Sequence, residues 1–234
     1  MSKIFHRILS ACILTLLLSV VSEAYAGYKA PSTQRAPGGR TSSSGTRGGC
    51  LGSAKLPLIA LAPQQHIGQT TSTHPTFAWF VPDSSELKML FSLYEYSANG
   101  NIKMVKQVNL KTSPGIMKFS LPKDSPGLTI GKKYLWQIAI ICNENYPSND
   151  LVTRAELEVV QLQSNVKTLL DTVKDPFQKV DIYANAGLWY DALDEALKTD
   201  NNLQSRKVVT SLLEDLAQIE KSNDLREIAT TSRI

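Results

Sequence analysis

Few residues of this chain have the types and spacing that side-chain catalysis requires. A nucleophilic Ser or Cys needs a His and an acid beside it. His66 and His74 are the histidines beyond the N-terminal region, and both stand in a Gln-, Ser- and Thr-rich stretch typical of a loop. The sequence contains no Gly-x-Ser-x-Gly elbow and no phosphate-binding Gly loop followed by Lys-Ser or Lys-Thr. It therefore predicts a protein that is not an enzyme.

Acidic pairs and possible metal ligands indicate catalysis no more strongly than the histidines do. Asp191, Asp194 and Glu195 are close together in a helical stretch, where the expected arrangement is a solvated face. No pair is singled out as acid and base. Two histidines without a Cys-x-x-Cys pair do not make a zinc site. The sequence predicts neither a metal nor a cofactor.

The first 26 residues have the three layers of a cleavable signal peptide. Lys3 and Arg7 precede an apolar run at 8–21, and Ala24-Tyr25-Ala26 supplies the small residues before Gly27. The run is shorter than the about 20 residues of a membrane anchor. We expect cleavage between Ala26 and Gly27 and a periplasmic or secreted mature protein without a transmembrane anchor.

Lipidation is the alternative form of export. Leu9-Ser10-Ala11-Cys12 matches a lipoprotein box by letter. Such a box ends the apolar stretch, whereas here the stretch continues past Cys12, so cleavage after Ala26 is favoured.

Cleavage leaves two cysteines, Cys50 and Cys142. An even pair in an oxidising compartment is most simply a disulfide. A bond closing a loop of about 90 residues would stabilise the fold by about 4–5 kcal/mol in the chain-entropy model. Two buried free thiols are the alternative.

Residues 27–49 are predicted to form a flexible basic leader. They are mostly Gly, Ser, Thr, Arg and Pro and carry four cations and no acids. Such a segment has little to bury and does not offset its ordering entropy. Since the basic charge is confined to this tail, we expect no basic surface for nucleic-acid binding on the folded part. A plain spacer is favoured over an arm that contacts an acidic polymer or lipid.

Residues 50–162 read as a β-sandwich domain. Short β-rich runs are separated by turn signals, and Ala98-Asn99-Gly100-Asn101 is a hairpin turn. This spacing predicts an immunoglobulin- or fibronectin-like sandwich of two sheets. The expected strands are 56–62, 76–81, 87–96, 102–110, 115–121, 134–142 and 151–162.

One motif sharpens the sandwich prediction. Leu128-x-x-Gly131-x-x-Tyr134 has the spacing of a tyrosine corner, in which the Tyr hydroxyl bonds to the backbone near the Gly. Large aromatic residues such as Trp79 and Trp136 are therefore core candidates before they are binding-site candidates.

Residues 163–234 change to a helical period. Asp175-Pro176 has the form of a helix start, and Gly187 is expected to end that helix. Helices at 188–197 and 203–219 follow. Tyr183-x-x-x-Gly187-x-Trp189 resembles the turn of a tetratricopeptide unit, but such scaffolds need about three repeats. A helical hairpin or short bundle packed on the sandwich is favoured.

Several blocks in one order resemble a cyanobacterial family catalogued as domain of unknown function 928. The blocks are 45–50, 56–63, 75–82, 114–122, 131–136 leading to Cys142, and 183–193. The resemblance implies a secreted or periplasmic cyanobacterial protein whose relatives often carry both cysteines. It implies no reaction, ligand or catalytic residue. Asn145-Tyr146-Pro147-Ser148 departs from the Asp-Arg-Ser-like stretch usual after Cys142.

Three functions stay open at this point. The favoured one is a non-enzymatic interaction module of the cell envelope, whose partner is an envelope protein or a cell-wall polymer. The second is carbohydrate binding or processing, and the third is a small-molecule site between sandwich and helices. Tyr94, Tyr96, Tyr146 and Tyr190 are candidate contact residues.

Overall fold

The structure is a computed structural model, and the predicted signal peptide, including Ala26, lies outside its described residues. So does most of the predicted leader, for which Ser42 and Ser43 are described by their backbone alone. The described residues are 27–32, 36–38, 42–43, 50, 55–82, 86–97, 100–198 and 203–231.

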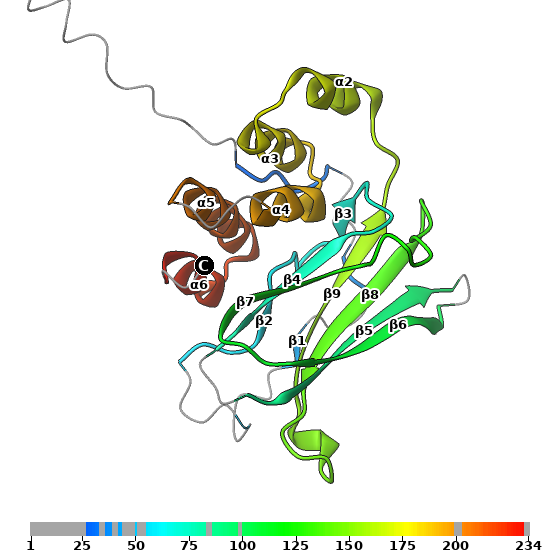
Figure 1. Ribbon diagram of the computed structural model, residues 1–234, viewed down its shortest axis with the longest axis vertical. Helices are drawn as coiled ribbons and strands as arrows, with labels where there is room; N and C mark the ends of the chain where they lie inside the picture. Colours follow the sequence, from blue (N-terminus) through cyan, green and yellow to red (C-terminus); the bar gives the residue numbers. More distant parts are fainter. Residues whose placement is uncertain are drawn as a thin grey trace, which may run out of the picture.

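Two β-sheets and a set of C-terminal helices make up the fold, without a closed barrel (Figure 1). The larger sheet has the order β1-β9-β8-β5-β6, and β3 pairs with β9 in parallel. Its strands are β1 (Ser42–Ser43), β3 (Gly68–Thr70), β5 (Lys88–Tyr96), β6 (Ile102–Lys111), β8 (Lys133–Ile140) and β9 (Leu151–Val159). The smaller sheet has the order β2-β4-β7, with β2 (Ile59–Ala60), β4 (Thr76–Val81) and β7 (Gly115–Ser120).

Aromatic side chains from the two sheets form the core between them. All six residues of β4 are buried, because this strand is covered on both faces. The ring of Phe77 on β4 lies 5.1 Å from that of Phe91 on β5 and 5.4 Å from that of Trp136 on β8. Phe119 of β7 approaches Phe91 at 4.6 Å. Aromatic pairs at these spacings stabilise a core beyond the burial of their area.

Five helices follow the last strand in the described part of the chain. Asp175 caps the second of them by accepting a hydrogen bond from the Phe177 N–H at 3.1 Å, as its position before Pro176 predicts. That helix ends before Gly187, whose φ of +77° favours glycine. The helices are α2 (Ser164–Thr172), α3 (Pro176–Asn185), α4 (Trp189–Lys198), α5 (Leu203–Glu220) and α6 (Asn223–Thr230).

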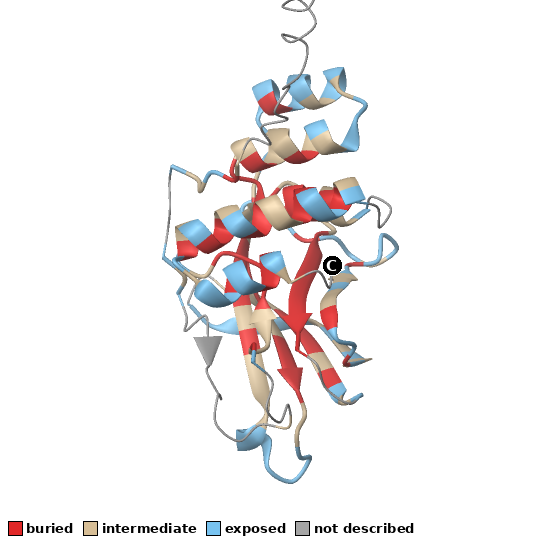
Figure 2. Ribbon diagram, turned by 90° about the vertical axis from the view of Figure 1, so that its left-hand side faces the viewer, coloured by how far each residue is buried: buried red, intermediate tan, exposed pale blue. Residues whose placement is uncertain are grey.

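Helix α4 connects the helices to the sheets. Its Trp189 indole N–H donates to the Leu61 carbonyl at 3.0 Å, and its Tyr190 hydroxyl accepts from the Trp136 indole at 2.9 Å. One continuous cluster of buried apolar residues contains side chains of both sheets and of α3 to α6. The buried sides of the helices face the sheets in Figure 2. The helical region and the strands therefore share a core.

The connection into β8 has the bond expected of a tyrosine corner. The Tyr134 hydroxyl accepts a hydrogen bond from the Thr129 N–H at 2.9 Å. Thr129 lies between Leu128, which is buried, and Gly131, whose φ is +82°. The bond ties the start of a central strand to the loop that precedes it.

The structure differs from the expectations at four strands. The predicted strand 56–62 pairs only at Ile59 and Ala60, because Pro57 and Pro63 lack the N–H that a ladder needs. The last strand ends at Val159 instead of residue 162. Strands β1 and β3 carry too little apolar pattern to be anticipated.

The expectation of a flexible leader fails at its first residues. Tyr28 is buried, and the Lys29 N–H donates to the Ala184 carbonyl of α3 at 3.1 Å. The large aromatic ring of Tyr28 gives this segment an apolar group to bury. The overall composition of the segment, rich in Gly, Ser and Pro, does not indicate this.

Candidate functional site

The most accessible apolar side chains of a strand lie on β6. Ile102, Met104 and Val105 are 49%, 50% and 42% exposed, and we call them the β6 edge patch. β6 stands at the end of the larger sheet's strand order, on the side away from the helices in Figure 1. Apolar groups gathered on an open sheet edge are typical of a contact surface.

Two tyrosines of β5 lie beside this patch. Tyr94 pairs with Met104 and Tyr96 pairs with Ile102 across the antiparallel ladder. Directly opposite residues share a face, so both half-buried rings extend the apolar surface inward. The Tyr96 hydroxyl donates to the Glu156 carboxylate of β9 at 2.7 Å. Its burial and this bond raise the pKa of Tyr96.

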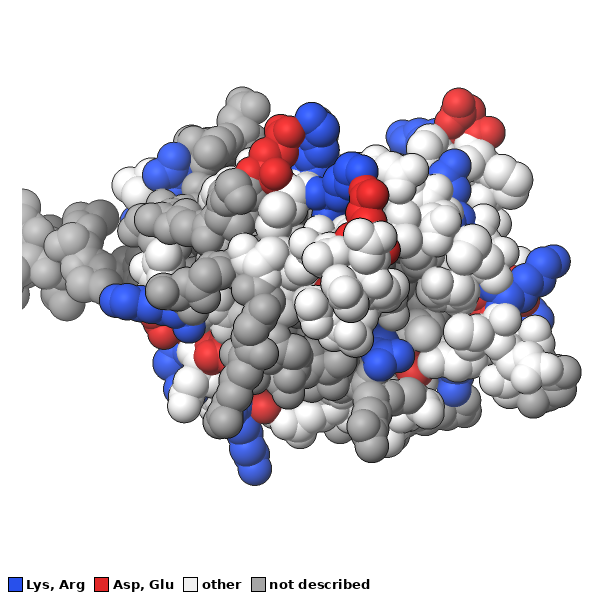
Figure 3. All heavy atoms as spheres, turned by 90° about the horizontal axis from the view of Figure 1, so that it is seen from below, with Lys and Arg blue, Asp and Glu red and all other residues white. Residues whose placement is uncertain are grey.

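Lysines alternate with the apolar residues along β6. Lys103, Lys106 and Lys111 stand on the strand, which carries no acidic residue. The register to β5 shifts between Leu93 and Tyr94, so Val105 has no opposite residue. Lysines and such irregularities disfavour the pairing of two identical edges. On the face seen in Figure 3, which looks from below the view of Figure 1, charges of both signs are interspersed.

His66 is buried in a network between the strands and the helices. Its Nε2 lies 2.9 Å from the Tyr28 hydroxyl, and its Nδ1 lies 3.7 Å from a carboxylate oxygen of Glu220 on α5. The same carboxylate accepts the backbone N–H groups of Gln64 and Gln65 at 3.0 Å. Burial lowers the pKa of His66 and raises that of Glu220. With His66 only 1% exposed, a substrate has no direct access to this ring.

His74 makes a separate set of bonds. Its Nδ1 lies 3.0 Å from the Thr73 hydroxyl, and its Nε2 lies 2.9 Å from the Ser125 carbonyl. In a Ser-His-Asp triad the acid binds Nδ1 and the nucleophile binds Nε2. In His74 a hydroxyl occupies Nδ1 and a backbone carbonyl occupies Nε2. The bond to Ser125 connects the loop before β4 with the loop after β7.

The acids of α4 are not the solvated face that their spacing predicts. Asp191 is 9% exposed and accepts the Thr71 N–H at 2.9 Å and the Thr71 hydroxyl at 2.8 Å. Asp194 accepts the Thr76 hydroxyl at 2.5 Å. These bonds attach α4 to Thr71 in the loop before β4 and to Thr76, the first residue of β4. Burial raises the pKa of Asp191, although the bonds from Thr71 oppose that shift.

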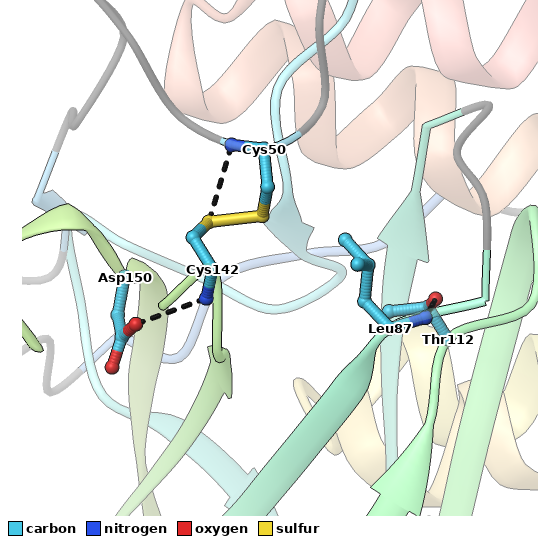
Figure 4. Close-up of a disulfide and its surroundings, with 5 residues drawn as sticks. All are labelled: Cys50, Leu87, Thr112, Cys142 and Asp150. Carbon is cyan, nitrogen blue, oxygen red and sulfur yellow. Dashed lines mark hydrogen bonds between the residues drawn. A yellow bond between two sulfur atoms is a disulfide. The ribbon is translucent and has the colours of Figure 1, made fainter. Parts of the chain in front are cut away.

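Cys50 and Cys142 form a disulfide with a Cα–Cα distance of 5.1 Å. Beside the disulfide, the Cys142 N–H donates to the Asp150 carboxylate at 3.1 Å (Figure 4). The Leu87 N–H, just before β5, donates to the Thr112 hydroxyl, just after β6, at 2.8 Å. The disulfide fastens the chain between β1 and β2 to the residues just after β8. It therefore links segments far apart in the sequence.

The other candidate contacts differ in accessibility. Tyr146 is 61% exposed, whereas Tyr190 is 1% exposed and belongs to the core, so the prediction of Tyr190 as a contact is wrong. Tyr190 lies on the side of α4 that packs against the sheets. The sequence alone does not show which side of this helix is covered.

A hollow of about 160 Å³ lies where the helices meet the larger sheet. Its lining includes Gln69 of β3, Gln161 after β9 and Leu188 before α4. Sites for drug-sized ligands have volumes of about 300–1,000 Å³. The hollow is therefore small for such a ligand.

The described ranges contain neither a metal-ligand cluster nor a membrane-spanning helix. There, no three or more His, Cys, Asp or Glu side chains group as metal ligands. No helix within those ranges has the length and apolar character of a membrane span.

The sequence matches the family model Domain of Unknown Function (DUF928) over residues 42–233. The chain belongs to this family. The DUF928 match covers the strands and the helices together, which agrees with their shared core. No curated protein matches the sequence.

One solved structure similar to this DUF928 chain is that of Astrotactin-2, described as a conserved vertebrate-specific and perforin-like membrane protein involved in neuronal development. The identity is 8% and the TM-score is 0.28, with 71% of this chain and 36% of that chain covered. The DUF928 chain thus spans about a third of that protein's length.

Proposed function

We propose that this protein is an exported, non-enzymatic interaction module of the cell envelope, periplasmic or secreted after cleavage between Ala26 and Gly27. The layered N-terminal sequence supports export, and a bonded pair of cysteines is typical of an oxidising compartment. The resemblance to the family supports a cyanobacterial source. The absence of an enzymatic role is supported by the two histidines, since His66 is buried and His74 is engaged by Thr73 and Ser125.

We assign the strands to an immunoglobulin-like sandwich. The strand orders β2-β4-β7 and β9-β8-β5-β6 follow the two-sheet pattern of that fold. The parallel pairing of β3 with β9 and the bond from Thr129 to Tyr134 support the assignment. Such domains commonly serve as binding modules, but their fold alone sets no partner.

The observation that carries the proposal is the β6 edge patch flanked by lysines. Exposed Ile102 and Met104 offer an apolar contact, and Lys103 and Lys106 offer cations on the same strand. The fitting partner is an apolar segment with acidic neighbours on another envelope protein. Two copies of this chain would bring like charges together, which disfavours self-association through this strand.

Site-specific crosslinking in the native envelope tests the proposal. A photoreactive residue replaces Met104 in one protein and Ile130 in the other, because these side chains have similar exposures of 50% and 49%. We expect a discrete crosslinked product from position 104 only. Lys106→Glu, opposite the uncharged Leu93, should remove that product without changing the melting temperature, whereas Lys123→Glu should retain it. Equal products from positions 104 and 130, or a product insensitive to the charge reversal, would overturn the proposal.

Carbohydrate binding is the second candidate because Tyr94 and Tyr96 are two residues apart on one face of β5. Rows of aromatic rings near acids are suited to sugars. Co-sedimentation with purified cell-wall polymer separates the candidates. Binding that Tyr94→Ala abolishes and that charge reversal of Lys106 leaves intact would favour the sugar. The small hollow near Leu188 gives the small-molecule candidate less support.

A further inference from the structure

The residues that follow the predicted cleavage point lie against a carboxylate of α5. The Tyr28 N–H donates to Asp215 Oδ2 at 3.0 Å. A Cβ added to Gly27 would lie 3.0 Å from Asp215 Oδ1 and 3.1 Å from Oδ2. The Gly27 nitrogen is bonded to the same Cα, about 2.5 Å from that Cβ position, so standard backbone geometry keeps it within about 5.5 Å of the carboxylate.

Asp215 has no cationic partner in the described part of the chain. No described Lys or Arg nitrogen lies within 4.0 Å of its carboxylate. Burial raises the pKa of Asp215, the Tyr28 N–H opposes this shift, and Glu214 adds to it. A partly buried carboxylate without a cation is costly to ionise. A positive charge at Gly27 would offset that cost.

We propose that hydrolysis of the Ala26–Gly27 peptide bond creates an α-ammonium group that forms an ion pair with Asp215 in the mature protein. The proposal rests on the export proposed above. The signal peptidase adds water across the bond, which leaves a carboxylate on Ala26 of the released peptide and an amine on Gly27. The amine takes up a proton at neutral pH. An unprocessed chain has an uncharged amide at the same position.

The ion pair would fix the junction between strands and helices. Tyr28 follows Gly27 directly, and its ring packs edge-on against Trp189 of α4 at 4.9 Å. Its hydroxyl reaches His66 at 2.9 Å. Holding Gly27 on α5 therefore holds a side chain that contacts the loop before β3 and α4 at once. The mature protein would gain stability that its precursor lacks.

Defined N-termini test this inference without relying on cleavage in the cell. The chain from Gly27 is produced from a fusion whose protease leaves no preceding residue, and its disulfide is formed by oxidation. Half of each preparation is acetylated at the Gly27 amine, with the product checked by mass and peptide mapping. The same pair is prepared with Asp215→Asn, which retains an oxygen for the Tyr28 N–H.

We expect the free amine to raise the melting temperature by about 3 °C over the acetylated form, the shift that a partly buried ion pair gives in a domain of this size. In Asp215→Asn the two forms should melt together. The free amine should also react more slowly with an amine-reactive ester at pH 7 in the chain that retains Asp215 than in Asp215→Asn. Equal melting of free and acetylated chains with Asp215 present would overturn the inference. So would an equal gain from the free amine in both backgrounds.

The outcome for export is read separately. N-terminal sequencing of protein from the native envelope shows whether the chain starts at Gly27. A different start would reject the proposed cleavage whatever the melting data show. A start at Gly27 with no coupling to Asp215 would reject the ion pair alone.

Discussion

The indole N–H of Trp136 donates to the hydroxyl of Tyr190 at 2.9 Å, and both residues are buried. The hydroxyl in turn donates to the Glu156 carbonyl at 3.1 Å. Tyr190 on α4 thus bonds a side chain of β8 and the backbone of β9. The ring of Tyr190 therefore fills part of the core beside the sheets. Its hydroxyl pairs with one buried donor and one buried acceptor of the larger sheet.

Tyr190→Phe should lower the free energy of unfolding by about 1–3 kcal/mol, because it leaves the Trp136 N–H and the Glu156 carbonyl without this partner. Urea unfolding followed by fluorescence measures the change. Tyr146→Phe is the control, since Tyr146 is 61% exposed and its hydroxyl is accessible to water. A Tyr190→Phe protein as stable as the wild type would show that this bonded hydroxyl does not stabilise the fold.

Gly68→Ala should destabilise the protein by about 1–3 kcal/mol through overpacking. Its new Cβ would lie 2.7 Å from the Tyr190 ring, so the ring must move. In the Tyr190→Phe background the cost should be smaller, because a ring without its hydrogen bonds shifts more freely. Gly131→Ala meets no atom within 4 Å and should add its strain independently of Tyr190→Phe. Urea unfolding of the double-mutant cycles gives both comparisons, and an additive Gly68 cycle would contradict the proposed contact.

Cys50→Ser with Cys142→Ser should lower the free energy of unfolding by about 3–5 kcal/mol. The bond spans a sequence separation of 92 residues and restricts the unfolded chain accordingly. Reducing agent should destabilise the wild type by a similar amount and leave the double variant unchanged. Denaturant midpoints with and without reductant measure both effects. A wild type indifferent to full reduction would show that the disulfide adds little stability.

The stability contributed by His66 should depend on pH. Burial lowers its folded pKa below the ordinary value of 6.5, so the unfolded state binds the proton first as the pH falls. This contribution is fully present above about pH 6.5 and decreases as the pH is lowered towards the folded pKa. Three acids have raised pKa values, namely Glu220 beside His66, Asp191 and Asp215. Because each costs more to ionise in the folded state, their contribution to stability increases as the pH falls, opposite to that of His66.

The difference between wild type and His66→Gln isolates the histidine from these acids. Melting temperatures measured from pH 7.5 to pH 5 should fall more steeply for the wild type than for the variant. His74→Gln is the control. Parallel curves for wild type and His66→Gln would exclude a contribution from His66 titration.

Local chemistry determined many elements before any tertiary contact was considered. The run of Thr76–Val81 made a strand with the expected bounds, because five of its six residues are β-prone and prolines bracket it. Asp175 and Pro176 set a helix start through a cap and a fixed φ, both properties of adjacent residues. The Cys50–Cys142 disulfide could be predicted because the proposed cleavage would leave one pair of cysteines.

Only the tertiary structure decided which side chains are accessible. Tyr28, Asp191 and Tyr190 all read from the sequence as solvent-facing, and all three are buried, because the partners that cover them are distant in the chain. The two edges of a sheet depend on strand order, so the exposure of Met104 on β6 could not be read from its own alternation. The approach of Gly27 to Asp215 is decided in the same way, by packing between residues 188 positions apart, whereas sequence patterns report only neighbours along the chain.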